Sequence, residues 1–174
     1  MKHNAELVYD RLSRYGFTVN AISAIVANME AESTINPGIW EGLFPYSGGY
    51  GLVQWTPYEK YADWAQYDWK DNGDKQCERI NFEFEHHIQY YFTDEFPISA
   101  YMFKNSTDMP EFLASAWMHN YERPASYASE NYRRERARYW FNYLSAIPAP
   151  EPEPAPEPSP EPAHKRGSTT WLFI

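Results

Sequence analysis

A run of alternating prolines limits the part of this chain that can form helices or sheets. From residue 148 to residue 162, every second residue is proline, with glutamate, alanine or serine between. Proline has no amide donor and a φ fixed at about −65°, so the run forbids helices and the ladders of a sheet. It predicts an extended spacer over residues 148–163, between a folded domain over 1–147 and a short tail over 164–174.

The folded part is predicted to be mainly helical (α+β). Apolar residues recur at helical spacing over residues 5–15 and again from Ile22 to Met29, where Thr18 or Asn20 can cap the helix. Further helices are expected near residues 75–93, 109–121 and 130–146.

One short stretch breaks the helical pattern. The glycine-rich segment 47–51 predicts a turn, and residues 52–55 are expected to form a short strand after it. The strand and turn would make residues 34–55 a small β-hairpin lobe. Thr56 and Pro57 then predict the N-cap and first residue of a third helix.

Composition limits the kinds of partner that the chain can bind and the ways in which its fold can be stabilised. The net charge is −9, which argues against nucleic-acid binding because phosphate contacts need Lys and Arg. Aromatic residues make up 18% of the chain, a surplus that suits a groove in which sugar rings stack. Cys77 is the only cysteine, so no disulfide forms within the chain. The polar N-terminus predicts no signal peptide, and no run reaches the length of a membrane span.

Two carboxylates stand near the end of the second predicted helix, at Glu30 and Glu32. Cleavage of a glycosidic bond needs a proton donor, and a carboxyl can fill that role when an apolar site raises its pKa. At about 100° per residue, both glutamates fall on the border of the buried face. Periodicity therefore only leans toward Glu32.

Three segments in order carry a family resemblance. They are Asn-Met-Glu-Ala-Glu-Ser-Thr-Ile-Asn-Pro-Gly-Ile-Trp at 28–40, Gly-Tyr-Gly-Leu-Val-Gln-Trp-Thr-Pro at 49–57 and Asn-Tyr-Glu-Arg-Pro at 120–124. Together they resemble the phage tail lysozyme family, and the first two resemble goose-type lysozymes and soluble lytic transglycosylases. The resemblance covers about residues 4–146 and implies a lysozyme-like helical domain with a small β-lobe.

The resemblance also implies roles for single residues. Glu32 would be the general acid, and Gln54 on the facing strand would hydrogen-bond a sugar amide or a water. Tyr121 is expected across the cleft, hydrogen-bonded to Glu32. The other implied substrate-binding residues are Tyr50 and Trp55, which would stack on sugar, and Gly49 and Gly51, which would let the backbone approach it.

A second catalytic carboxylate stays open at this point. Glu30, Glu41, Asp63 and Glu122 are all candidates. Glu30 and Glu122 both lie in family segments, and an ion pair with its neighbour Arg123 or a helix cap is the simpler explanation of Glu122, which therefore ranks low.

Other chemistry is set aside. His86 and His87 are adjacent and point about 100° apart on a helix, so they cannot easily share a metal, and no zinc-peptidase spacing is present. No nucleophile signature surrounds Cys77. The stretch 133–136, Arg-Arg-Glu-Arg, is predicted to be a solvated helix face. No metal and no cofactor are implied.

The implied activity is that of an N-acetylmuramidase, which hydrolyses the β-1,4 bond between N-acetylmuramic acid and N-acetylglucosamine in bacterial peptidoglycan. The expected context is a phage or phage-derived protein in the virion or at the host cell wall, with peptidoglycan and phage tail proteins as partners. Three alternatives stay open: a lytic transglycosylase on the same fold, a non-catalytic wall-binding module, and a structural tail protein.

Overall fold

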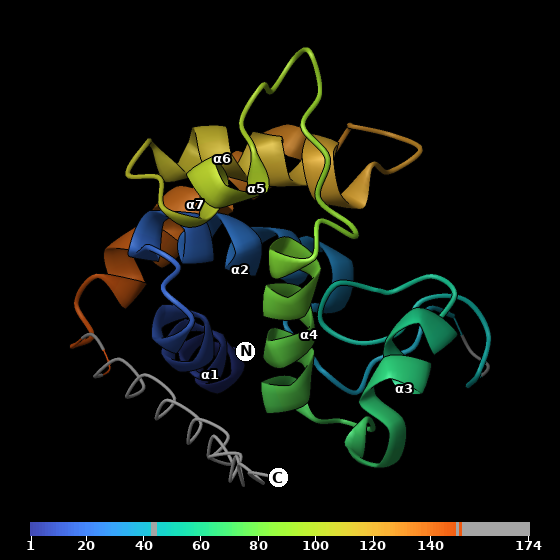
Figure 1. The fold of residues 1–174 in the computed structure, drawn as a ribbon. Coiled ribbons are helices and arrows are strands. Elements are labelled where there is room, and N and C mark those ends of the chain that lie inside the picture. The colour runs from blue at the N-terminus through green and yellow to red at the C-terminus, as the bar shows by residue number, and fades with distance from the viewer. Residues whose placement is uncertain (43–44, 149, 151–174) are drawn as a thin grey trace, which may run out of the picture.

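Helix α2 (Val19–Ser33) runs through the centre of the computed structural model, which describes residues 1–42, 45–148 and 150 (Figure 1). The helix begins at Thr18, whose hydroxyl accepts the amide of Ala21 at 3.2 Å, as one of the two predicted caps. Every residue from 21 to 30 is buried. A helix covered on all sides has no single apolar stripe, so periodicity could not choose between its two glutamates.

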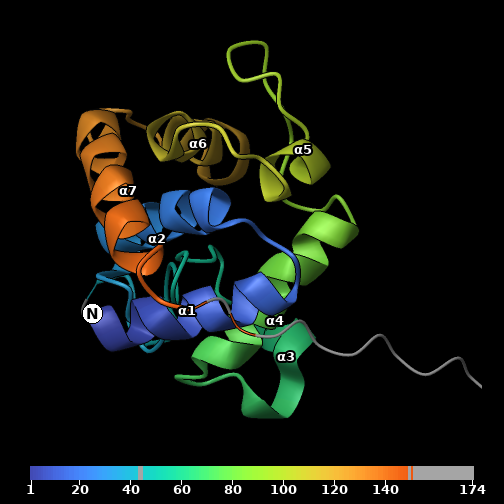
Figure 2. The same cartoon turned by 90° about the vertical axis from the view of Figure 1, so that its left-hand side faces the viewer.

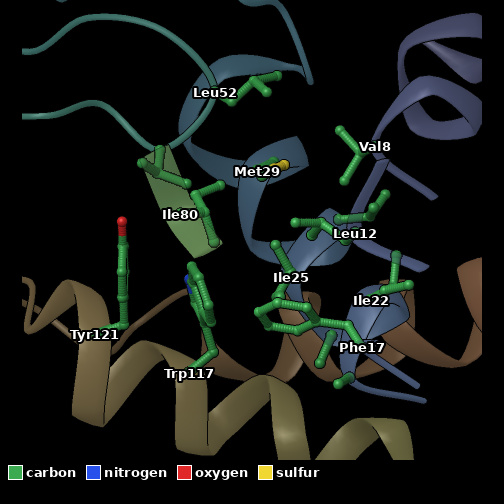
Figure 3. Close-up of a cluster of buried hydrophobic side chains, with 14 of the residues drawn as sticks. Val8, Leu12, Phe17, Ile22, Ile25, Met29, Leu52, Ile80, Trp117 and Tyr121 are labelled. Atoms are coloured by element: carbon green, nitrogen blue, oxygen red, sulfur yellow. The ribbon is translucent and has the colours of Figure 1, made fainter. Parts of the chain in front are cut away.

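Four longer helices surround α2: α1 (Lys2–Arg14), α4 (Gly73–Glu85), α6 (Pro110–Trp117) and α7 (Glu130–Leu144). Helices α1, α6 and α7 pack directly on α2, and α1 packs on α4 (Figures 1 and 2). Their apolar side chains form one core, part of which is drawn in Figure 3. Each fully buried Leu, Ile or Phe contributes about 1.5–3 kcal/mol, which holds the fold without a disulfide.

Short elements connect the longer helices: α3 (Glu59–Ala65), the 3₁₀ turn η1 (Gln66–Asp68), α5 (Ala100–Lys104) and the π-helical turn η2 (Met118–Glu122). Helix α5 was not predicted, because five residues are too few to show a period. Turn η2 continues α6 and widens it, with the amide of Arg123 bonded to the carbonyl of Met118 at 2.8 Å. π-Turns of this kind are frequent at functional sites.

Two predicted helix boundaries are wrong. The Thr56–Pro57 peptide bond is cis, and α3 begins only at Glu59. Helix α4 ends at Glu85 rather than near residue 93, and the segment 86–99 after it projects from the body in both views (Figures 1 and 2).

The predicted strand at 52–55 is also wrong. Among the described residues no strand forms, and isolated antiparallel bridges join Trp40 to Tyr50 and Tyr50 to Trp55. Left-handed backbone at Gly51 (φ 78°) and Gln54 (φ 52°) closes the segment into a turn. The lobe is held by packed aromatic rings rather than by a ladder of hydrogen bonds.

The spacer and tail predicted for residues 148–163 and 164–174 lie, apart from residues 148 and 150, outside the described part of the chain. Across that described part, no helix combines the length and the apolar character needed to cross a membrane.

Candidate active site

A cleft of about 410 Å³ opens between the end of α2, the loop-built lobe and η2. Of the predicted site residues, five line it: Glu32, Gln54, Trp55, Tyr121 and Glu122. Glu41, Lys60 and Gln89 line it too. Of the four candidates for a second carboxylate, only Glu41 and Glu122 are among its lining residues.

A larger hollow of about 930 Å³ lies between α6, α7 and residues 95–96, and none of the predicted site residues lines it. Its Glu111 forms an ion pair with the exposed Arg138. The smaller cleft is the better candidate site, because five of the predicted site residues come together there.

Glu32 takes its place from the way α2 ends. Thr34 and Ile35 adopt left-handed backbone (φ 54° and 56°), which stops the helix directly after Ser33. The Ser33 hydroxyl, which is buried, lies 2.9 Å from the carbonyl oxygen of Met29 and 2.8 Å from that of Leu52. Glu32 therefore lies on one wall of the cleft, and the neighbouring Ser33 links that wall to the opposite one through Leu52.

The carboxylates of Glu32 and Glu122 meet at one guanidinium, that of Arg133 on α7. Arg133 forms an ion pair with Glu32 and another with Glu122 at 2.5 Å, and it donates to Asn28 Oδ1 at 2.7 Å. The side chains of Arg133 and Glu122 are 5% and 6% exposed, whereas that of Glu32 is 26% exposed. Both carboxylates line the cleft, and Glu32 is the more exposed of the two.

Burial raises the pKa of Glu122 to about 8. Arg133 opposes this shift, and the neighbouring Glu32 adds to it through its charge and a hydrogen bond. The indole Nε1 of Trp117 donates to Glu122 Oε1 at 2.9 Å. A carboxyl with a raised pKa, in contact with a more exposed one, is the kind of pair that can retain a proton near neutral pH.

The predicted hydrogen bond between Tyr121 and Glu32 is wrong. The Tyr121 hydroxyl donates to Glu83 on α4, which is 2% exposed and also accepts from Trp55 Nε1 at 3.0 Å and Arg79 Nε at 2.8 Å. A buried carboxylate needs several donors, and these three supply them. Burial raises the pKa of Tyr121 well above its usual value, and the Glu83 charge adds to the shift.

Hydrogen bonds to the buried Glu83 hold two cleft residues, Trp55 and Tyr121, in place. Trp55 and Tyr121 both line the cleft, and both are anchored to the same carboxylate. Tyr121 also stacks on Trp117 at 4.0 Å between ring centroids, and the two rings rise side by side in Figure 3. Both rings are almost fully buried, with Trp55 4% and Tyr121 2% exposed, so their contacts hold the cleft from within the core.

Gln54 is partly used within the lobe. Its side-chain nitrogen donates to the carbonyl of Gly51 at 2.9 Å and to that of Ile39 at 3.3 Å. Neither Gly49 nor Gly51 lines the cleft. A Cβ at Gly51 would lie 2.5 Å from Gln76 Oε1, so the close approach that requires glycine is to α4 and not to a ligand.

Tyr50 also lies away from the cleft lining. It is 1% exposed, its ring packs on Trp40 at 4.5 Å and on Trp69 at 5.1 Å, and its hydroxyl accepts the amide of Asp71 at 2.7 Å. In this position it stabilises the lobe.

The residue that the sequence interpretation missed most clearly is Arg133, which is buried instead of lying on a solvated face. Its signal was available, because the buried residues of α7 are Arg133, Ala137, Trp140 and Leu144, at helical spacing. An arginine on an apolar stripe indicates a buried partner of opposite charge. Within the ranges that the structure covers, no cluster of His, Cys, Asp and Glu is arranged to hold a metal.

Comparisons with known proteins place the chain among phage proteins. Residues 3–144 match a family model described as phage tail lysozyme. The chain is also similar to Morphogenesis protein 1 of Bacillus phage B103, with 38% identity over 149 residues. The match covers 83% of this chain and 40% of that relative, so the chain spans less than half of the relative's length.

Proposed function

Because the chain belongs to the phage tail lysozyme family, we propose that it hydrolyses the β-1,4 bond between N-acetylmuramic acid and N-acetylglucosamine in bacterial peptidoglycan. The observation that carries the proposal is the position of Glu32. Its carboxyl reaches the cleft from the end of a buried helix, while the carboxylate beside it and their shared guanidinium are screened from solvent.

In this mechanism Glu32 is the general acid. It gives its proton to the bridging oxygen as the bond from that oxygen to C1 breaks, and the electron pair of the bond stays on the oxygen. A water molecule adds its oxygen to C1 and releases a proton, which restores the acid. One water is consumed for each bond that is cut.

The cleft offers groups suited to an N-acetylated sugar. Trp55 and Tyr121 reach the cleft only with the edges that stay exposed, and Glu83 holds both in place, so any apolar contact with the sugar is made at those edges. Because the side-chain nitrogen of Gln54 is engaged within the lobe, we propose that its amide oxygen accepts from the N–H of an N-acetyl group.

The proposal includes delivery by a phage particle, which the family and the phage relative support. Phage tail proteins are then the neighbours of this domain. Mass spectrometry of purified particles would detect the chain there, and its absence from particles of the phage that encodes it would contradict this part of the proposal.

The experiment that tests the enzymatic proposal is digestion of purified peptidoglycan by the wild type and by Glu32→Gln, with products identified by mass. Glutamine keeps the shape of the side chain but cannot donate a carboxyl proton, so product release should fall at least ~100-fold. Glu30→Gln is the matched control. Glu30 also accepts from an indole, Trp140 Nε1 at 2.7 Å, and from an arginine, Arg136 Nε at 2.8 Å, but it lies outside the cleft lining.

The products decide between the alternatives. Reducing-end muropeptides from the wild type alone would support a hydrolase that uses Glu32. Products lighter by one water would identify a lytic transglycosylase. Binding to the wall without product release would replace the enzyme by a binding module, and absence of both would favour a structural tail protein.

A further inference from the structure

We propose that Glu122 is a positioning residue that shares a single proton with Glu32 and thereby keeps the acid protonated. The inference rests on the proposed function and names a partner for its acid. The geometry behind it is the meeting of three chain segments: Glu32 from α2, Glu122 from η2 and Arg133 from α7.

Arg133 poses a problem for a general acid. A guanidinium in direct contact with a carboxylate favours the ionised form, which has no proton to donate. Glu32 alone against Arg133 would therefore be a poor acid. The structure places a second carboxylate on the same guanidinium, at 2.5 Å, so that one positive charge faces two acidic groups.

The charge balance of this cluster favours one retained proton. Two ionised carboxylates with one cation would leave a net negative charge in a site where Glu122 and Arg133 are almost fully buried. Like charges in contact at such a site do not both ionise, so one of the pair stays protonated. The cluster is then neutral, as the low polarity of its surroundings requires.

Exposure separates the roles within the pair. Glu122 also lines the cleft, but it is held by the Trp117 indole and only 6% exposed, which suits the member of the pair that holds charge rather than donating to the substrate. Glu32 is 26% exposed and reaches the cleft. When Glu32 gives the shared proton to the leaving oxygen, both carboxylates are left ionised beside Arg133. The proton released by the attacking water then restores the pair.

Few other charges bear on this cluster. The further titratable groups that line the cleft are Glu41, Lys60 and Tyr121, and the Tyr121 hydroxyl is directed to Glu83. Glu41 and Lys60 are exposed to solvent, which screens their charges. The pair and Arg133 therefore set the pH range in which the acid is protonated.

The test is the pH profile of kcat/KM for the wild type, Glu122→Gln and the control Glu30→Gln. In Glu122→Gln, Arg133 pairs with Glu32 as its one carboxylate, which favours the ionised form of Glu32. The alkaline limb of the profile should therefore move at least one pH unit toward lower pH. A limb that does not move, or that moves equally in Glu30→Gln, would overturn the proposal.

A second measurement keeps the test independent of folding of the variant and of turnover. In wild-type protein labelled with ¹³C at the glutamate carboxyls, one carboxyl signal should stay protonated above pH 6, and Glu32→Gln should change it. Complete ionisation of all glutamates by pH 6 would overturn the shared proton even in an active enzyme. No turnover at any pH, with the protonated signal present, would count against the proposed function alone.

Discussion

The hydroxyl of Ser33 lies 2.8 Å from the carbonyl oxygen of Leu52, and this contact joins the helix that carries Glu32 to the opposite wall of the cleft. The Met29 carbonyl, 2.9 Å from the same hydroxyl, already accepts the amide of Ile35. We therefore infer that the Ser33 hydroxyl donates to the carbonyl of Leu52, because a buried carbonyl without a donor would be costly.

Substitution Ser33→Ala should lower the free energy of unfolding by about 1–3 kcal/mol, because it leaves the buried Leu52 carbonyl without its donor. It should also slow peptidoglycan cleavage, since the lobe is freed from the acid. Urea denaturation and muropeptide release measure the two effects. The matched control is Ser23→Ala, since Ser23 is equally buried on α2 but donates within the helix, to Val19 at 2.7 Å. Equal loss of activity in both variants would show that the link between the walls is unimportant.

Substitution Arg133→Met should be strongly destabilising, by about 3–5 kcal/mol, because it strands two carboxylates without their cation. The loss should be larger at pH 8 than at pH 5, because protonation of Glu122 at the lower pH reduces the negative charge left without a partner. Urea denaturation at both pH values measures it. Arg134→Met, at the exposed neighbouring position, should change stability by less than about 0.5 kcal/mol. A loss of the same size at both pH values would contradict the proposed charge balance.

The raised pKa of Glu122 predicts how stability depends on pH. Between its ordinary pKa of 4.5 and the folded-state value of about 8, the folded chain holds a proton that the unfolded chain has released. Rising pH therefore favours unfolding across this window, by at most ~1.4 kcal/mol per pH unit, and the effect levels off above pH 8. Urea denaturation from pH 4.5 to 9 should show this slope in the wild type and a smaller one in Glu122→Gln. Identical slopes would exclude a proton bound more tightly in the fold.

Cys77 should be inert in the native protein. It lies fully buried in the core, and burial raises the pKa of its thiol, so the reactive thiolate is almost absent. Iodoacetamide should modify it at least ~100-fold more slowly than a free thiol, at a rate that follows unfolding as urea is added. Rapid modification without urea would mean that the contact between α1 and α4 opens readily.

The sequence predicted the helical domain and the place of α2 because those features depend on local signals. The Thr18 cap and the left-handed end of α2 arise from residues a few positions apart. Four of the residues that the family resemblance pointed to, together with Glu122, line one cleft. Their catalytic and binding roles stay predictions until activity is measured.

What sequence could not predict was the pairing of polar side chains across the core. The Tyr121 hydroxyl was predicted to bond to Glu32, but it donates to Glu83. Glu83 is more deeply buried and needs more hydrogen-bond donors, and it also accepts from Trp55 and Arg79. Such competition depends on which carboxylate the fold covers. The lobe was misjudged for a related reason, since alternating residues at 52–55 meet left-handed backbone at Gln54 that only the packed structure stabilises.

Arg133 stands 101 residues after the glutamate that it binds. During synthesis the helix bearing Glu32 leaves the ribosome well before α7 does. A nascent chain that ends before α7 would thus hold Glu32 without the Arg133 guanidinium that pairs with it. The proposed catalytic cluster can therefore assemble only after α7 has been synthesised.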